Sequence, residues 1–230
     1  MIRKSLFVIL ALFVMASFSY ASEREIPKTQ KEKVSYAIGM ELAGNLKKTD
    51  IDLDFSYVIE GLKDAYAGKK PRVDEKDLTE TMAKFQKEYS AKQADERKKM
   101  SEKNKKEGET FLAENKKKPG VVTLASGLQY KVIEEGKGKS PKASDNVTVH
   151  YKGTLIDGTE FDSSFRRGQP ATFNVSAVIP GWTEALQKMK EGSKWQLFIP
   201  SKLAYGEQGA GRAIGPNSTL IFEVELISVK

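Results

Sequence analysis

The sequence predicts an α+β protein in which an all-helical amino-terminal half precedes an antiparallel sheet wrapped on one short helix. Apolar residues recur at helical spacing over 29–68. After Gly120 the period changes to two, and apolar residues alternate with polar ones in 147–152 and 219–226. Only one helical stretch, at about 182–190, interrupts these strands. A sheet with one buried face, packed on that helix, satisfies both patterns.

The composition is that of a soluble protein with a surplus of charge. The 230 residues are 39% hydrophobic and 30% charged, with a formal net charge of +7. Lysines are mixed with acidic residues along most of the chain and no recognition motif accompanies them, so we expect no nucleic-acid partner. The chain has no Cys, and its only His is His150, which we expect on the surface. Catalysis by a cysteine thiol is therefore excluded, and a multi-histidine metal site or a Ser-His-Asp triad is disfavoured. We expect no cofactor.

Residues 1–21 have the pattern of a secretory signal peptide. Arg3 and Lys4 precede an almost wholly apolar run, and residues 19–21 offer a small-x-small cleavage site. A membrane anchor is the alternative, but the run is shorter than the ~20 apolar residues that a spanning helix needs. We therefore expect an exported protein, either periplasmic or associated with the outer membrane.

Two amphipathic helices are predicted within residues 22–70, which we assign to a helical dimerisation domain. The first begins at a capping box formed by Thr29 and Glu32, and Asp54 is the expected N-cap of the second. The apolar stripes are Val34, Ile38, Leu42 and Leu46 in the first helix, and Phe55, Val58, Ile59, Leu62 and Tyr66 in the second. A unit of about 40 residues is below the size that usually folds without help. We therefore expect these helices to pair with those of a second copy of the chain, giving a homodimer.

Residues 71–118 are predicted to form a long charged linker helix. Large apolar residues recur at a/d spacing only at its start, over 78–89. Over 90–109 the residues are mostly charged, and Met100 is the one large apolar side chain. We expect a solvent-exposed spacer helix that bends at Gly108, because glycine weakens a helix by about 1 kcal/mol. A disordered charged linker is the alternative.

The last part of the chain, residues 119–230, carries several short motifs in a fixed order. They are Val149-His150-Tyr151-Lys152-Gly153, Gly158-Thr159-Glu160-Phe161-Asp162-Ser163-Ser164, Val178-Ile179-Pro180-Gly181-Trp182, Ala204-Tyr205-Gly206, Ile214-Gly215-Pro216 and the strand 219–226. In this order they resemble the FKBP-type peptidyl-prolyl cis/trans isomerases, and several ordered blocks are far more specific than one motif. With Tyr36-Ala37-Ile38-Gly39 and the charged helix, the whole chain resembles the exported, dimeric branch of macrophage infectivity potentiator (Mip) and FkpA-like proteins.

The resemblance implies a half-barrel sheet curled over the short helix, with the active pocket between them. It assigns catalysis to Tyr151, Phe161, Asp162, Trp182 and Tyr205. It assigns substrate binding to Arg167, Phe173, Val178, Ile179, Ile214 and Phe222. Trp182 would form the pocket floor, while the Ile179 N–H and the Tyr205 hydroxyl would donate to substrate carbonyls.

Some of these assignments have alternatives. Plain core packing is the alternative for Phe173 and Phe222, and an ion pair with Arg167 is the alternative for Asp162. Three rim positions are smaller than is usual in the family, namely Ala171, Ala210 and Ala213. We therefore expect a more open rim, which leaves open the affinity for macrocyclic inhibitors and the preference for the residue before proline.

The implied activity is rotation about X–Pro bonds in proline-containing exported proteins during folding. No bond is broken, so an aromatic pocket that desolvates the amide, together with a few hydrogen-bond donors, is sufficient without covalent chemistry. The alternative is a dimeric holdase chaperone, in which binding of unfolded clients matters more than isomerisation.

Overall fold

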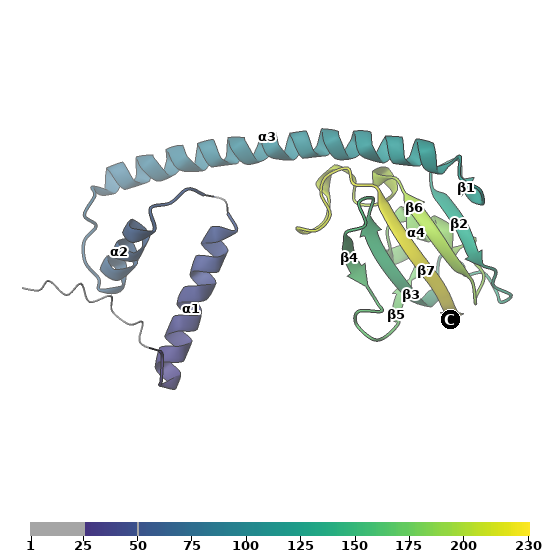
Figure 1. Cartoon of the computed structure of the whole chain (residues 1–230), viewed down its shortest axis with the longest axis horizontal. Helices are drawn as coiled ribbons and strands as arrows, with labels where there is room; N and C mark the ends of the chain where they lie inside the picture. Colours follow the sequence, from purple (N-terminus) through teal and green to yellow (C-terminus); the bar gives the residue numbers. More distant parts are fainter. Residues whose placement is uncertain (1–25, 50) are drawn as a thin grey trace, which may run out of the picture. The chain divides into compact units, whose positions relative to one another are not determined.

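The computed structural model describes residues 26–49 and 51–230 (Figure 1). They form two compact units that divide between Asp74 and Glu75. The predicted signal peptide, residues 1–21, lies outside the described residues. Within the described ranges, no helix combines the length and the apolar character needed to cross a membrane.

The amino-terminal unit contains two helices, α1 (Gln30–Lys47) and α2 (Phe55–Tyr66). Both predicted N-caps are confirmed. The Glu32 N–H donates to Thr29 Oγ1 at 3.2 Å, and the Thr29 N–H donates to the Glu32 carboxylate at 2.9 Å. Asp54 caps α2 through its side chain. Each cap satisfies backbone groups that a helix start leaves unpaired, so the sequence marks both starts.

The apolar stripes of these two helices remain largely on the surface of the unit. No residue of α1 is buried. The exposed apolar side chains include Val34, Tyr36, Ile38, Met40 and Leu42 on α1, and Phe55, Tyr57, Ile59, Leu62 and Tyr66 on α2. Most helical stability in proteins comes from burying an apolar face, so this unit lacks much of what would stabilise it alone.

The carboxy-terminal unit begins with α3 (Glu75–Asn115), a continuous helix of 41 residues (Figure 1). The prediction of a long helix is confirmed, and the alternative of a disordered linker is wrong. Charged pairs along it include Asp95 and Lys99, whose carboxylate and ammonium groups lie 2.7 Å apart. Such i,i+4 pairs each stabilise an exposed helix by a few tenths of a kcal/mol.

Two expectations about α3 are corrected by the structure. The helix continues through Gly108 without a break, and Gly108 is buried because Thr219 lies against it. A Cβ at Gly108 would come within 2.3 Å of the Thr219 hydroxyl oxygen. The second half of α3 is also not a free spacer, because side chains from Arg97 to Asn115 bond to the domain that follows.

The rest of this unit is a seven-stranded antiparallel sheet with one short helix, as predicted (Figure 1). The strands are β1 (Val121–Thr123), β2 (Gln129–Glu134), β3 (Asn146–Leu155), β4 (Glu160–Ser163), β5 (Ala171–Asn174), β6 (Lys194–Ile199) and β7 (Leu220–Val229). Their order is β1-β2-β6-β7-β3-β4, and β5 pairs with the other end of β3. The helix is α4 (Pro180–Leu186). It starts two residues earlier than expected, since Pro180 fits the first helical turn.

The core lies between the sheet and α4. Alternate residues of the three central strands point into it, which confirms the predicted period of two. The fully or nearly buried members are Val147, Val149 and Tyr151 on β3, Trp195, Leu197 and Ile199 on β6, Leu220, Phe222, Val224 and Leu226 on β7, and Trp182, Ala185 and Leu186 on α4. Trp195 stacks on Tyr130 with ring centres 4.2 Å apart and is absent from the pocket lining, so it belongs to the core.

Candidate active site

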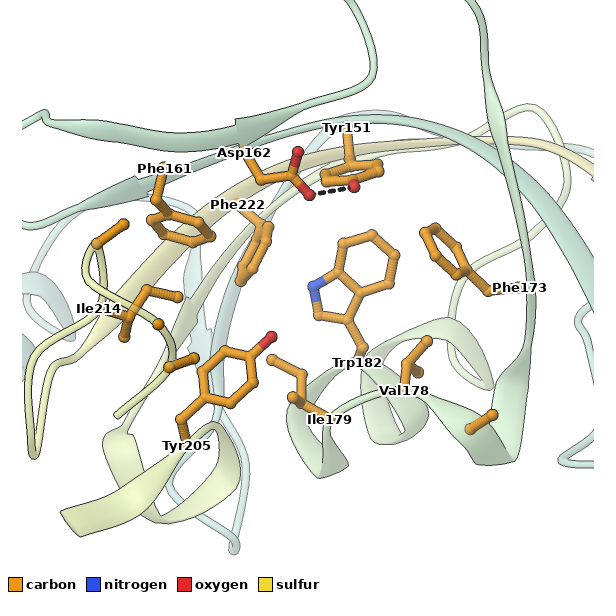
Figure 2. Close-up of a pocket in the computed structure, with 14 residues that line it drawn as sticks. Tyr151, Phe161, Asp162, Phe173, Val178, Ile179, Trp182, Tyr205, Ile214 and Phe222 are labelled. Carbon is orange, nitrogen blue, oxygen red and sulfur yellow. Dashed lines mark hydrogen bonds between the residues drawn. The ribbon is translucent and has the colours of Figure 1, made fainter. Parts of the chain in front are cut away.

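A cavity of about 620 Å³ opens at one end of this core (Figure 2). Its walls come from β3, β4, β5, β7, α4, the short segment that leads into α4 and the loop that follows β6. The lining residues are Tyr151, Phe161, Asp162, Phe173, Ala177, Val178, Ile179, Trp182, Tyr205, Ala210, Gly211, Ala213, Ile214 and Phe222. Aromatic and aliphatic side chains dominate the lining, which is typical of a site for a small apolar group.

Trp182 lies at the centre of the pocket and is only 4% exposed (Figure 2). Its indole ring stands nearly perpendicular to three other rings. The ring centres are 5.3 Å away for Tyr151, 5.2 Å for Phe222 and 5.8 Å for Phe173, at interplanar angles of 90°, 82° and 85°. Edge-to-face packing of this kind is the preferred geometry of aromatic pairs, so the floor is rigid and apolar. The buried indole N–H of Trp182 has no hydrogen-bond partner among the described residues.

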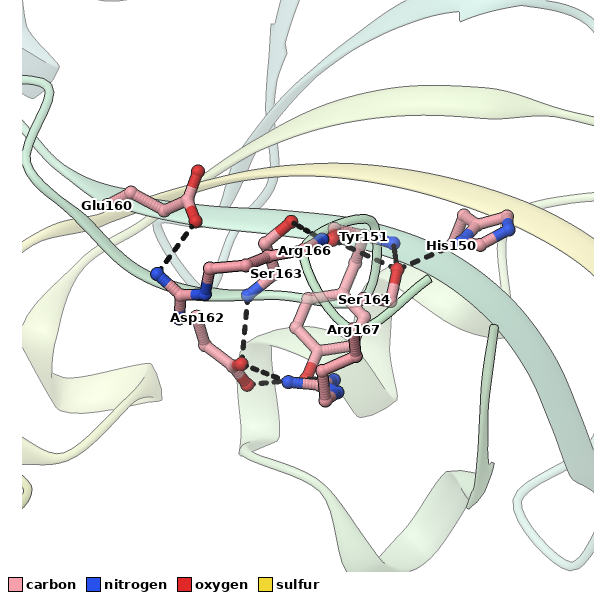
Figure 3. A network of polar contacts seen from close by, with 8 residues as sticks. All are labelled: His150, Tyr151, Glu160, Asp162, Ser163, Ser164, Arg166 and Arg167. Carbon is pink, nitrogen blue, oxygen red and sulfur yellow. Dashed lines mark hydrogen bonds and ion pairs between the residues drawn. The ribbon is translucent and has the colours of Figure 1, made fainter. Parts of the chain in front are cut away.

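One carboxylate, Asp162, faces this apolar surface. The Tyr151 hydroxyl donates to Asp162 Oδ2 at 2.5 Å. Arg167 forms a short ion pair with Asp162 Oδ1 and donates from Nη2 to the Tyr151 hydroxyl oxygen at 2.7 Å (Figure 3). The Ser163 N–H completes the set at 2.8 Å from Asp162 Oδ1. The ion pair that the sequence offered as the alternative for Asp162 is therefore present, and it belongs to a larger network.

This network fixes the protonation states of its members. Burial disfavours the charged form of Asp162, but hydrogen bonds from Tyr151 and Arg167 outweigh it and hold the pKa of Asp162 below its ordinary value. Burial, together with the hydrogen bond to Asp162, raises the pKa of Tyr151. Tyr151 and Asp162 in turn raise the pKa of Arg167. At neutral pH the site therefore holds a carboxylate, a phenol and a guanidinium.

A second layer of bonds holds Tyr151 in place. The Tyr151 N–H donates to Ser164 Oγ at 2.8 Å, and the Ser164 N–H donates to the Tyr151 carbonyl at 2.9 Å. His150 Nδ1 lies 3.0 Å from Ser164 Oγ (Figure 3). The His150 ring also stacks on Phe165, with ring centres 4.6 Å apart. The expectation of His150 as a simple surface residue is thus corrected, because its ring is half-buried and tied to this turn.

The loop after β6 forms the other wall of the pocket. Tyr205 lies at its start and is 40% exposed. The tip is closed by an antiparallel bridge, in which the Ala210 N–H donates to the Ile214 carbonyl at 2.8 Å and the Ile214 N–H donates to the Ala210 carbonyl at 3.1 Å. Gly209, with φ of 64°, makes the turn into this bridge. Ala210 and Ala213 line the pocket as the rim expectation requires.

The structure brings almost all of the sequence-predicted site residues to this one pocket. Arg167 is not part of the lining and reaches the site through Tyr151 and Asp162. Ala171 is the exception among the rim residues, because it lies on β5, pairs with Val149 of β3 and packs against the core. Two lining residues were missed, Ala177 and Gly211. Both are small and directly adjoin predicted positions, so only that adjacency could have indicated them.

Two family models match the chain. The model described as FKBP-type peptidyl-prolyl cis-trans isomerase matches residues 137–227. The model described as the domain amino terminal to FKBP-type peptidyl-prolyl isomerase matches residues 31–132. The chain therefore belongs to the FKBP-type peptidyl-prolyl cis-trans isomerase family, as its ordered motifs predicted.

Individual relatives narrow this assignment. The outer membrane protein MIP of Legionella longbeachae is 49% identical over 216 residues, which cover 94% of this chain and 93% of the relative. The peptidyl-prolyl cis-trans isomerase Mip of Coxiella burnetii is 49% identical over 88% of each chain. The crystal structure of FkpA from Escherichia coli matches with 40% identity and a TM-score of 0.67, over 89% of this chain and 99% of that one. Within the family, the chain thus falls in the Mip and FkpA branch.

Proposed function

We propose that this pocket accelerates rotation about X–Pro bonds by holding the proline ring on the Trp182 floor, beneath the Tyr151–Asp162 pair. The observation that carries the proposal is the set of three rings standing nearly perpendicular to Trp182, which makes an apolar surface of fixed shape. Rotation is slow in water because amide resonance must be lost, with a barrier of about 18–20 kcal/mol. The twisted amide is less polar than the planar one, so an apolar pocket favours it over water.

Donors around the pocket would hold the flanking carbonyls in the turned geometry. We assign this role to the Ile179 N–H and the Tyr205 hydroxyl. Ile179 directly precedes α4, and its carbonyl accepts from the Trp182 N–H at 2.9 Å, so its position is fixed. The unpartnered indole N–H of Trp182 is a further donor, since a buried donor without a partner is satisfied when a ligand supplies an acceptor.

Asp162 has an orienting and electrostatic role in this proposal, with no proton transfer. Its carboxylate is ionised at neutral pH and accepts from both Tyr151 and Arg167. A carboxylate held in this way stabilises partial positive charge on the groups beside it. It does so without reorganising during the reaction. An acceleration of ~10⁵ requires about 7 kcal/mol, which desolvation and a few fixed hydrogen bonds supply.

The test is an isomerisation assay on proline-containing peptides with purified protein. We expect Asp162→Ala and Tyr205→Phe each to lower kcat/KM by about tenfold, the value of roughly one hydrogen bond. Lys188→Ala is the matched control, since this exposed side chain lies beyond α4 and outside the pocket lining. Equal rates for wild type and both pocket variants, at unchanged folding, would show that the chemistry lies elsewhere.

We further propose that the amino-terminal helices pair with those of a second copy. The support is their exposed apolar surface, with Ile38 54% and Leu42 50% exposed on α1. Burying such side chains contributes about 25 cal/mol per Å² of apolar area. Sedimentation should show a dimer for wild type and for the control Lys33→Glu, and a monomer for Ile38→Glu/Leu42→Glu. A dimer that persists in the double variant would contradict this interface.

A second candidate activity is holdase binding of unfolded clients, which exposed apolar side chains of α2 such as Tyr57 and Tyr66 would support. It predicts that full-length Asp162→Ala, with impaired isomerase activity, still suppresses aggregation of an unfolded protein. Loss of suppression together with the isomerase activity would argue against it.

Export, to the periplasm or the outer membrane, is proposed from residues 1–21. Mass measurement of the mature chain after expression would detect cleavage after Ala21.

A further inference from the structure

The second half of α3 contacts the same loop that forms one wall of the pocket. Arg97 makes the outermost contact. Its Nη2 donates to the carbonyl oxygens of Glu207 and Gln208, each at 2.9 Å. Hydrogen bonds from a charged donor are stronger than neutral ones, and these two hold consecutive peptide groups of η3 (Gly206–Gln208), just before the tip of the loop.

Two further side chains of α3 hold the other end of the loop. Asn104 Nδ2 donates to the Pro216 carbonyl at 2.8 Å, and Asn217 Nδ2 donates to Ser101 Oγ at 2.7 Å. Asn217 is the one residue other than glycine with positive φ, 54°, in the described chain. Its N–H donates to the Gly206 carbonyl at 2.8 Å, which closes the loop on itself. Ser101 therefore bonds the side chain of a residue whose backbone is in an unusual conformation.

Steric contact accompanies these bonds. A Cβ at Gly215 would lie 3.0 Å from Asn104 Nδ2 and 3.1 Å from the Met100 sulfur, so helix and loop approach closely there. Met100 is the one large apolar residue in the charged stretch 90–109, and its sulfur lies where α3 approaches the loop.

The contacting residues repeat along α3 at the spacing of one helix face. They are Arg97, Ser101, Asn104, Gly108, Phe111 and Asn115. Successive members are four, three, four, three and four positions apart, which keeps them on one side of the helix. The interface is therefore a continuous stripe, and its outer part lies on the loop.

The opposite side of the loop faces the pocket. Ala210, Gly211, Ala213 and Ile214 line the cavity, between the anchored carbonyls of Gln208 and Pro216. The loop thus lies between α3 and the substrate site. We propose that Arg97, Ser101 and Asn104 are positioning residues for isomerisation, which act by holding this loop in the conformation that binds the substrate.

The proposal rests on the pocket being the isomerase site, and it makes a specific kinetic claim. A loop that is released from α3 spends only a fraction of its time in the binding-competent conformation. Apparent affinity falls by that fraction, while chemistry in the bound complex is unchanged. Weakening the α3 contacts should therefore raise KM and leave kcat near its original value.

The experiment uses the full-length chain and the double variant Arg97→Ala/Asn104→Ala. We expect KM for a proline-containing peptide to rise about five- to tenfold, with kcat within about twofold of wild type. Amide hydrogen exchange should accelerate in residues 205–218 and stay unchanged in β3 and β7. Lys99→Ala is the matched control, because Lys99 pairs with Asp95 on α3 itself and should alter neither quantity.

Two additional variants keep the test decisive. Arg97→Lys retains a charged hydrogen-bond donor, so its KM should lie between the KM values of wild type and of the alanine variant. A merely structural role for Arg97 would not predict this partial rescue. Ser101→Ala removes a single hydroxyl and provides the same readouts if the double variant folds poorly. Unchanged KM and unchanged exchange in residues 205–218 would overturn the proposal, as would an equal fall in kcat. An inactive wild type would instead overturn the pocket assignment, and loop exchange would still decide whether α3 holds the loop.

Discussion

The two walls of the pocket are built in different ways. On one side, Tyr151 and Phe222 belong to neighbouring strands and are only 5% exposed, and Trp182 beneath them is 4% exposed. On the other side, Tyr205 is 40% exposed and the loop that follows turns at glycines with positive φ. Strand pairing and core burial thus fix the first wall, whereas a small number of individual bonds fix the second.

This difference has an energetic consequence. The strand wall shares its side chains with the core, so the interactions that shape the site are the same ones that stabilise the fold. Gly153 illustrates how tightly it is packed, since a Cβ there would lie 2.6 Å from the Phe161 ring and 2.7 Å from the Phe222 ring. Changes in the strand wall should therefore reduce stability and activity together. Changes in the loop wall should reduce activity with a smaller loss of stability.

The largest effect is expected from Phe222→Ala in the strand wall. Removing a buried aromatic ring costs about 3–5 kcal/mol of unfolding free energy, and here it also removes a neighbour of Trp182. We expect both the urea midpoint and kcat/KM to fall strongly. Ile227→Ala is the control on the same strand, because Ile227 is 39% exposed and should cost far less. A Phe222→Ala protein with normal stability and impaired activity would break the proposed distinction between the walls.

A smaller effect is expected from Gly209→Ala in the loop wall. Gly209 has φ of 64° and ψ of −165°, a region that essentially only glycine adopts, so alanine there costs about 1–3 kcal/mol in backbone strain. Its Cβ would also lie 2.3 Å from the Ile214 carbonyl oxygen. The tip must shift to relieve this contact, and a shift of about 1 Å in a positioned group can cost up to ~10²-fold in rate. Activity should therefore fall by more than the loss of stability explains.

Gly211→Ala is the matched comparison for this prediction. Gly211 also has positive φ, 56°, but a Cβ there would meet no atom within 4 Å. It should also lose stability through backbone strain, but its activity should fall less than that of Gly209→Ala, because no atom of the loop has to move to make room for the Cβ. Urea unfolding and peptide isomerisation rates on both variants separate the two contributions, and equal activity losses would show that strain alone is responsible.

The strand wall is also the part that the sequence predicted best. The alternation in 147–152 and 219–226 places Tyr151 and Phe222 on the buried face without reference to any relative. Ala171 shows where the motifs were insufficient. Its position among the family motifs suggested the rim, but its pairing with Val149 depends on the register of β5, which no local pattern specifies.

The contact between α3 and the loop could not be predicted from composition. Its members Arg97, Ser101, Asn104 and Gly108 are polar or small, so the stripe has no hydrophobic period and resembles a solvated helix face. Their spacing is regular, but spacing without apolar character is also found on exposed helices. The sequence indicated Gly108 as a weak point of the helix. In the structure, Thr219 packs against Gly108 and leaves no space for a larger side chain.

The smallest effect is expected from pH, which acts on the polar edge of the strand wall. The pKa of Asp162 is lowered in the fold, so its ionised form contributes stability that is present above the ordinary value of about 3.9 and is lost as pH falls through the lower folded value. The pKa of Tyr151 is raised, so its phenol stays protonated up to at least its ordinary value of about 10. The network therefore keeps one protonation state between about pH 5 and 9.

We accordingly expect kcat/KM to be flat across that range and to fall only under more acidic conditions, in parallel with protonation of Asp162. Asp162→Asn should be less active at neutral pH and should lack the acidic fall. The measurement is the pH profile of peptide isomerisation for both proteins, each checked for folding at every pH. The same acidic fall in Asp162→Asn would contradict the assignment of the profile to this carboxylate.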